Sequence, residues 1–208
     1  MSDVKIIKGE NWIPNSYILH DEKEAIVIDP GCSYNTLIDS LKYFKLLAVL
    51  ATHGHYDHII HVSSLKNEYK VPFYLHPDDA MLVKHANMYI KLFNGDKFIE
   101  IPKIEYFVED SEELDFGFIK VSVIHTPGHT EGSVCFRVDN NLFSGDLLFK
   151  NNIGRTDLPG GNTAKIKDSL KKINSSFSDI HLLPGHKDTT TLNEERKFNK
   201  KFIDIISS

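Results

Sequence analysis

The stretch from Thr52 to His58 concentrates side chains that could bind metal. It reads Thr-His-Gly-His-Tyr-Asp-His, with three imidazoles and one carboxylate within six residues. Imidazole nitrogen and carboxylate oxygen are ligands that zinc and similar divalent ions prefer. His53 and His55 could bind one ion, and Asp57 and His58 could face a second. Because so short a segment cannot place four ligands around one ion and leave room for water, two neighbouring ions are predicted. A histidine-rich polar loop without metal is the disfavoured alternative.

An apolar run must position this stretch. Residues 46–51 read Leu-Leu-Ala-Val-Leu-Ala and end abruptly in polar residues, which is typical of a buried strand that ends in a loop. Asp57 and His58 would then lie in the first turn of a helix that continues through Glu68. His61 follows one turn later and could face the site, but a packed or solvent-exposed position is favoured for it.

The pattern Thr-His-x-His-x-Asp-His resembles that of the metallo-β-lactamase-fold superfamily. Three further segments match its motifs in order: TPGHT at residues 126–130, SGD at 144–146 and PGH at 184–186. Ile60 stands where the family usually has a glycine, which affects the start of the helix but removes no ligand. The resemblance implies one ion bound by His53, His55 and His129, a second bound by Asp57, His58 and His186, and Asp146 as a bridge between them.

Within the superfamily, the sequence Gly-Arg-Thr-Asp-Leu-Pro-Gly-Gly at residues 154–161 resembles the short, single-domain bacterial members of the glyoxalase II (hydroxyacylglutathione hydrolase) branch. The resemblance implies a thioester hydrolase with two divalent ions, zinc first, with iron or manganese as alternatives. Two ions about 3.5–4 Å apart can hold a bridging water deprotonated near neutral pH. Asp57 is the candidate catalytic residue.

Other functions stay open on the same fold. One is a lactonase, and another is a persulfide dioxygenase that uses one iron held by two histidines and an aspartate. A non-catalytic interaction module is disfavoured because all seven candidate ligands are present. The sequence ends at residue 208, soon after His186, so we expect it to lack the helical region that binds glutathione in longer members. Arg155, Tyr89 and Lys187 could contact an anionic substrate, although solvent-exposed roles are favoured.

Composition restricts the class of protein. A length of 208 residues predicts one domain, residues 1–208. The 24 basic against 29 acidic residues give a net charge of −5 and no basic footprint for nucleic acid. We expect neither a secretory signal nor a membrane span, and therefore a cytoplasmic protein whose partner is a small (thio)ester. The oligomeric state stays open. Cys32 and Cys135 are predicted to be buried packing residues.

The apolar patterns predict alternating strands and helices. An acidic turn at Pro77-Asp78-Asp79 opens a helix whose stripe from Met81 to Phe93 forms core or pocket wall. Asp29, after the strand 25–28, either supports the metal loop, as the resemblance implies, or bonds its own turn.

Two groups of strands with interspersed helices predict an α+β fold, and the resemblance makes it an αβ/βα sandwich of two packed mixed β-sheets flanked by helices. The other predicted elements are strands at 4–7, 16–19, 72–75, 119–124, 133–138 and 141–143, a last strand at 180–183, and helices at 35–45, at 163–177 with Thr163 as N-cap, and after a Thr191–Glu194 capping box, with Phe198, Phe202 and Ile205 on one face.

Overall fold

A computed structural model describes residues 3–93 and 98–208 of the protein. Its first sheet has six strands in the order β1-β2-β3-β4-β5-β6. The strands β1, β2 and β3 pair antiparallel, whereas β3 to β6 run parallel. Their bounds are β1 Asp3–Ile7, β2 Ser16–His20, β3 Glu24–Ile28, β4 Lys45–Leu50, β5 Phe73–Leu75 and β6 Tyr106–Phe107.

The second sheet also has six strands, in the order β14-β13-β10-β9-β8-β7. Only β10 and β13 pair parallel. A separate hairpin joins β11 (Leu148–Phe149) to β12 (Asn152–Ile153). The bounds of the sheet strands are β7 Glu113–Asp115, β8 Lys120–His125, β9 Val134–Val138, β10 Asn141–Gly145, β13 His181–Pro184 and β14 Thr190–Thr191.

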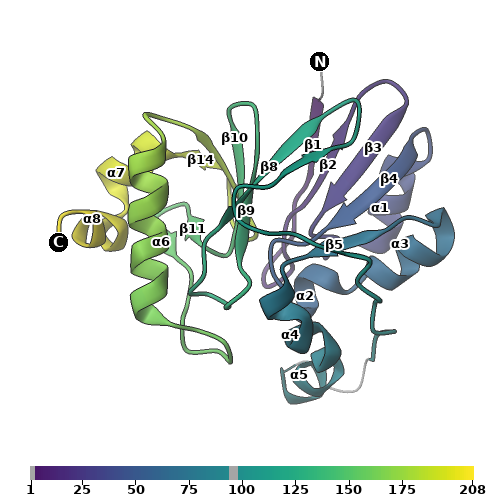
Figure 1. The fold of residues 1–208 in the computed structure, drawn as a ribbon, viewed down its shortest axis with the longest axis horizontal. Helices are drawn as coiled ribbons and strands as arrows, with labels where there is room; N and C mark the ends of the chain where they lie inside the picture. Colours follow the sequence, from purple (N-terminus) through teal and green to yellow (C-terminus); the bar gives the residue numbers. More distant parts are fainter. Residues whose placement is uncertain (1–2, 94–97) are drawn as a thin grey trace.

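Helices cover the outer face of each sheet, so the chain forms four layers (Figure 1). The helices α1 (Tyr34–Leu41) and α3 (Val62–Tyr69) cover the first sheet. The second sheet is covered by α6 (Thr163–Ser176), α7 (Leu192–Phe198) and α8 (Lys200–Ile206). At the lower end of the view lie α2 (Tyr56–Ile59), α4 (Ala80–Lys84) and α5 (Ala86–Phe93), with a 3-10 turn at Pro77–Asp79 before α4.

Side-chain alternation on the strands explains the layering. On β3, Ala25 and Val27 pack beneath the helices, whereas Ile26 and Ile28 point between the two sheets. This is the period of two expected for a strand buried on both faces. Phe136 completes the layer between the sheets from β9. The predicted αβ/βα sandwich is therefore confirmed.

Several predicted element boundaries were wrong. The first helix ends at Leu41 rather than at residue 45, because β4 begins at Lys45. The helix after His58 is interrupted, since the backbone of His61 (φ −107°, ψ 6°) leaves the helical region between α2 and α3. The stripe from Met81 is likewise divided between α4 and α5 at His85.

Several caps and element boundaries predicted after residue 160 also differ from the structure. Asn162, not Thr163, caps α6, and its side chain accepts hydrogen bonds from two backbone amides. A further strand, β14, follows the predicted last one. Thr191 caps α7 as expected, but Glu194 accepts from Thr190 instead of completing the capping box. Asn199 then separates α7 from α8, which leaves Phe198 71% exposed.

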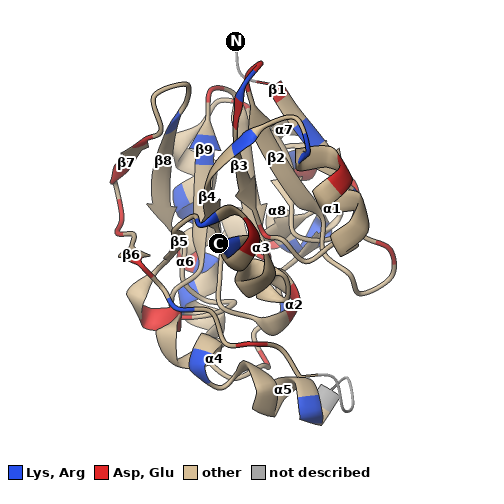
Figure 2. Ribbon diagram, turned by 90° about the vertical axis from the view of Figure 1, so that its right-hand side faces the viewer, with Lys and Arg blue, Asp and Glu red and all other residues tan. Residues whose placement is uncertain are grey.

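Predictions drawn from composition had mixed outcomes. Cys32 and Cys135 are both buried and free, as predicted. On the face that Figure 2 shows, basic and acidic residues are interspersed, and the absence of a nucleic-acid partner stays a prediction. Across the described ranges, no helix has both the length and the apolar character that a membrane crossing would require.

Candidate metal centre

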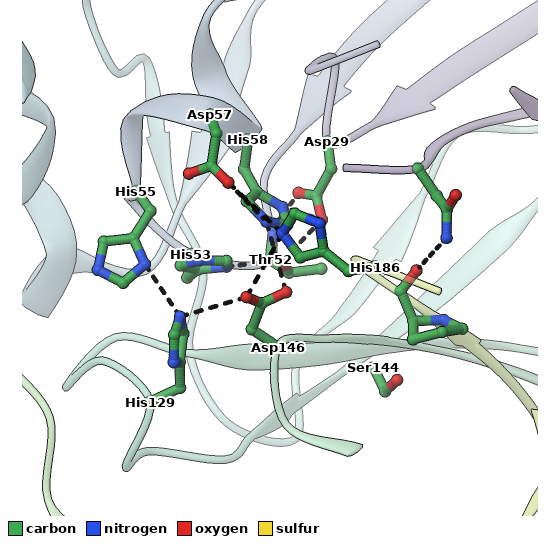
Figure 3. A network of polar contacts seen from close by, with 12 residues as sticks. Asp29, Thr52, His53, His55, Asp57, His58, His129, Ser144, Asp146 and His186 are labelled. Carbon is green, nitrogen blue, oxygen red and sulfur yellow. Dashed lines mark hydrogen bonds and ion pairs between the residues drawn. The ribbon is translucent and has the colours of Figure 1, made fainter. Parts of the chain in front are cut away.

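Three histidines from two distant loops face one another at the end of the sandwich. His53, His55 and His129 each offer a ring nitrogen, and these atoms lie within 4.8 Å of one another. The His129 Nε2 atom is 2.9 Å from His55 Nδ1, and the ring centroids of His53 and His129 are 4.8 Å apart. Figure 3 shows the three side chains converging. We call this group the histidine half-site.

A second group, which we call the mixed half-site, consists of Asp57, His58 and His186. Their ligand atoms also lie within 4.8 Å of one another. The Asp57 Oδ2 atom is 3.5 Å from His186 Nε2 and 3.8 Å from His58 Nε2. This group is more open than the first, since the side chains of Asp57 and His186 are 28% and 19% exposed.

Asp146 lies between the two half-sites. Its Oδ2 atom is 3.5 Å from His129 Nε2 and 3.7 Å from His186 Nε2, and its Oδ1 atom is 3.4 Å from His58 Nε2. The seven candidates named from the sequence therefore form one continuous cluster (Figure 3). Their roles as metal ligands stay a prediction.

The ends of four strands deliver these side chains to one rim. His53 and His55 follow β4, His129 follows β8, Asp146 follows β10, and His186 follows β13. Asp57 and His58 lie in α2, as predicted. Strand ends are rigid supports, which a preorganised site requires.

Close approach of the loops requires glycine at two positions. A Cβ atom on Gly185 would lie 2.3 Å from Asp146 Oδ1 and 2.6 Å from His58 Cε1. A Cβ atom on Gly145 would lie 2.5 Å from Thr52 Oγ1, and its backbone has a φ of +48°. The glycines before Asp146 and His186 therefore let these loops reach the cluster.

The cluster has the donors that a metal ion needs. Within the described residues, His53 Nε2, His58 Nε2 and Asp146 Oδ1 are buried and have no hydrogen-bond partner. His129 donates from Nδ1 to the carbonyl of Arg155 at 2.8 Å, so its Nε2 lone pair faces the cluster. Unpaired buried lone pairs of this kind are costly unless a cation satisfies them. The residues present therefore fit divalent metal.

Burial controls the protonation of the histidine half-site, whereas neighbouring carboxylates control that of His58 in the mixed half-site. It lowers the pKa of His55 to about 3 and that of His53 well below its usual value, so both imidazoles are neutral and can act as ligands. Burial alone would lower the pKa of His58 too, but the three carboxylates around it raise that pKa well above its usual value. The carboxylates around His58 thus favour positive charge at the mixed half-site, carried either by His58 itself or by a bound cation.

Asp29 supports the metal loop, which decides between the two roles considered for it. Its Oδ1 accepts from the backbone N–H of Thr52 at 2.7 Å, and its Oδ2 accepts from Thr52 Oγ1 at 2.7 Å. The same Oδ2 is 2.9 Å from His58 Nδ1, which donates to it. This bond leaves His58 Nε2 free to face Asp146.

Asp79 is a residue of the site that the sequence did not reveal. It was predicted only as an acid in the first turn of a helix, and it is fully buried. It accepts from Gly54 N at 2.7 Å, Thr130 Oγ1 at 2.7 Å and Gly132 N at 2.8 Å. It therefore joins the loop of His53 and His55 to the loop of His129.

Asn15 and Tyr17 hold the turn that carries His186 through hydrogen bonds to its backbone carbonyls. Asn15 Nδ2 donates to the carbonyls of Pro184 at 3.0 Å and Lys187 at 2.8 Å. Tyr17 donates its hydroxyl to the Pro184 carbonyl at 2.6 Å. Neither residue was predicted, because only the paired sheets bring β2 beside the turn that carries His186.

The remaining candidates lie outside the cluster. The Arg155 side chain pairs with Asp157 at 2.7 Å and contacts the site only through its backbone carbonyl. Lys187 forms part of the turn around His186, with a φ of +72°. His61 packs near Tyr34, with ring centroids 5.1 Å apart. Tyr89 lines a neighbouring pocket.

Comparison with known proteins identifies the family. Residues 9–181 match the metallo-β-lactamase superfamily. The chain belongs to this superfamily. It is 33% identical to the crystal structure of BLEG-1, a B3 metallo-β-lactamase, with a TM-score of 0.87 over 97% of this chain and 99% of that one. A di-iron-bound form of TTHA1623 gives 32% identity and a TM-score of 0.85 over 95% and 100%.

Curated relatives include metal-dependent hydrolases. The probable metallo-hydrolase YqgX of Bacillus subtilis is 30% identical, over 89% of this chain and 90% of that one. The hydroxyacylglutathione hydrolase GloC of Haemophilus influenzae is 30% identical, over 88% and 90%. The histidine-rich cluster and these relatives together make the protein a metal-dependent hydrolase of the superfamily.

Proposed function

We propose that the protein hydrolyses thioesters, in the manner of a hydroxyacylglutathione hydrolase, with two divalent ions bound in the cluster. One observation carries the proposal: two adjacent half-sites share a single carboxylate, Asp146. Three imidazoles would hold one ion, and Asp57, His58 and His186 the other. Zinc suits these ligands best, and the di-iron form of TTHA1623 supports iron as the alternative.

Each part of the chain then has a defined task. When bound, such a metal pair supplies Lewis acidity and brings the pKa of water towards neutrality. Asp29 holds the proton of His58 at Nδ1, and the Arg155 carbonyl holds that of His129 at Nδ1. Asp57, the most exposed carboxylate of the cluster, would accept a proton from the attacking water.

The surroundings of the cluster favour a substrate with a good leaving group. Among the described residues, no lysine, arginine or tyrosine side chain forms a hydrogen bond or ion pair with the seven candidates. An alkoxide or amide anion needs a proton to leave, and Asp57, once protonated, would have to supply it. A thiol has a pKa of about 8.5, so it can leave as a thiolate without protonation. This favours a thioester over a lactone or a β-lactam.

The relatives agree in part. GloC is named a hydroxyacylglutathione hydrolase, which supports the thioester, whereas BLEG-1 is named a metallo-β-lactamase, which also implies water attack on a carbonyl. A dioxygenase with one iron and three protein ligands would leave four of the seven candidates unused. Hydrolysis with two ions uses them all.

A substrate panel tests the proposal. The zinc-loaded protein should hydrolyse S-lactoylglutathione at least about 100-fold faster than the matching oxygen ester or a β-lactam, because only the thiolate leaves unaided. Loading with iron and measuring oxygen uptake on a persulfide gives the competing readout. Oxygen uptake without thioester cleavage would overturn the proposal.

A further inference from the structure

Beside the histidine half-site lies a pocket that the mechanism has not used. Its volume is about 220 Å³. We propose that it binds the acyl side of the substrate and selects a short, uncharged acyl chain. This inference rests on the proposed thioester hydrolysis. The pocket is lined mainly by Met81, Leu82, His85, Tyr89, Pro159 and Gly160.

The pocket lies directly against the loops that carry the histidines. A Cβ atom on Gly54, between His53 and His55, would lie 3.2 Å from Leu82 Cβ. On the opposite wall, a Cβ atom on Gly160 would lie 3.8 Å from Thr130 Cα, next to His129, and 4.0 Å from Leu82 Cδ1. The pocket therefore adjoins the loops of the histidine half-site, and in this proposal the acyl chain of a substrate whose carbonyl lies at the histidines extends into it.

The charges around the pocket exclude an anionic group. Asp78 and Glu131 line it, and no lysine or arginine does so among the residues that the structure describes. Glu131 is itself paired with Lys165. Arg155 is paired with Asp157. A carboxylate in the acyl chain would be repelled by these acidic side chains, whereas an alkyl chain would contact Leu82 and Met81.

The size of the pocket limits the chain. Its volume of about 220 Å³ is smaller than the 300–1,000 Å³ of sites that enclose a whole drug-sized ligand. It equals the volume of roughly seven water molecules, enough for about four to six carbon atoms. The pocket therefore holds one part of the substrate, and the thiol half lies elsewhere.

An acyl series on one neutral thiol, N-acetylcysteamine, tests the selection. Each added methylene from acetyl to hexanoyl should raise kcat/KM by about twofold to fourfold, as expected for its burial. The glutaryl thioester should react at least about tenfold more slowly than the pentanoyl thioester because of its carboxylate. Rates independent of chain length, or faster with glutaryl, would overturn the inference.

Matched variants locate the effect. Leu82→Gln should reduce the hexanoyl-to-acetyl ratio of kcat/KM at least fivefold. Met88→Gln places the same side chain on α5, where Met88 is 57% exposed and does not line the pocket, and it should leave the ratio unchanged. Equal effects of the two variants would contradict the assignment.

A binding measurement separates this inference from the proposed chemistry. Amide NMR spectra are recorded with a non-hydrolysable 2-oxohexyl thioether of N-acetylcysteamine. The amide signals of Leu82, Tyr89 and Gly160 should shift, and that of Met88 should not. These shifts without turnover of any thioester would support the pocket but defeat the proposed function. Turnover with shifts confined to residues outside the pocket would defeat the pocket alone.

Discussion

The two half-sites rest on buried aspartates that act in different ways. Asp29 contacts a candidate ligand itself, since its Oδ2 atom lies 2.9 Å from His58 Nδ1. Asp79 contacts none of the seven candidates and instead binds Gly54, Thr130 and Gly132 in the loops that carry the histidines. The mixed half-site is thus set by orienting one side chain, and the histidine half-site by joining two loops. Changes at the two aspartates should therefore have different consequences.

The largest effect should come from the residue common to both half-sites. Asp146→Asn removes a charged ligand from each, so turnover should fall by at least about 1000-fold, more than the loss of one oxyanion donor costs. Metal analysis and steady-state kinetics measure it, with circular dichroism to confirm the fold. Near-normal activity with two bound ions would refute the shared role.

Single variants that each remove one candidate ligand should show that the two half-sites bind their ions separately. His55→Ala and His186→Ala should each reduce the metal content from two ions to one per chain. Activity should fall by at least about 100-fold, the upper end of what loss of an outer partner costs. Mass spectrometry under native conditions counts the ions. If either variant kept two ions, the division into half-sites would be wrong.

Asp29→Asn should weaken metal binding selectively. Its amide has a single oxygen and cannot accept from both the backbone N–H of Thr52 and Nδ1 of His58, which bond to different oxygens of the carboxylate, so the orientation of His58 is no longer fixed together with the loop. Loss of such an outer partner lowers metal affinity by about 10- to 100-fold. Competition with a chelator measures the two affinities. The affinity of the mixed half-site should fall, and equal weakening of both half-sites would show that Asp29 does not act through His58 alone.

The smallest effect on the metals should come from Asp79→Asn. The amide group of the variant would face the backbone N–H of Gly54 or Gly132, leaving one buried donor unsatisfied. The free energy of unfolding should fall by about 2 kcal/mol, while metal stoichiometry is kept. Asp78→Asn, whose side chain is 57% exposed in the parent protein, is the control and should change it by less than about 0.5 kcal/mol. Loss of metal without loss of stability would contradict the distinction between the two aspartates.

The sequence predicted the cluster because each of its members belongs to a short, recognisable local motif. His53, His55, Asp57 and His58 are adjacent, and His129, Asp146 and His186 follow short glycine-containing motifs at strand ends. The layered fold was predicted from two groups of short apolar strands with interspersed helices and from the resemblance. The ligand motifs and the apolar patterns of the strands each lie within a few residues of the feature that they predict.

What the sequence could not predict depends on distant partners. Asp79 reads as an ordinary helix-start acid because its hydrogen-bond donors lie 25, 51 and 53 positions away. The role of Asn15 could not be predicted either, since its side chain donates to carbonyls 169 and 172 positions away. The N-cap of α6 was missed for a local reason: Asn162 and Thr163 are both good caps, and only the backbone angles decide between them.

The proposed function depends on two metal ions that share Asp146, and anomalous scattering from crystals of the metal-loaded protein tests this most directly. Data collected on both sides of the absorption edge of the metal should show two peaks, one at the histidine half-site and one at the mixed half-site, with Asp146 between them. A single peak, with Asp57, His58 and His186 making no contact to it, would contradict the account.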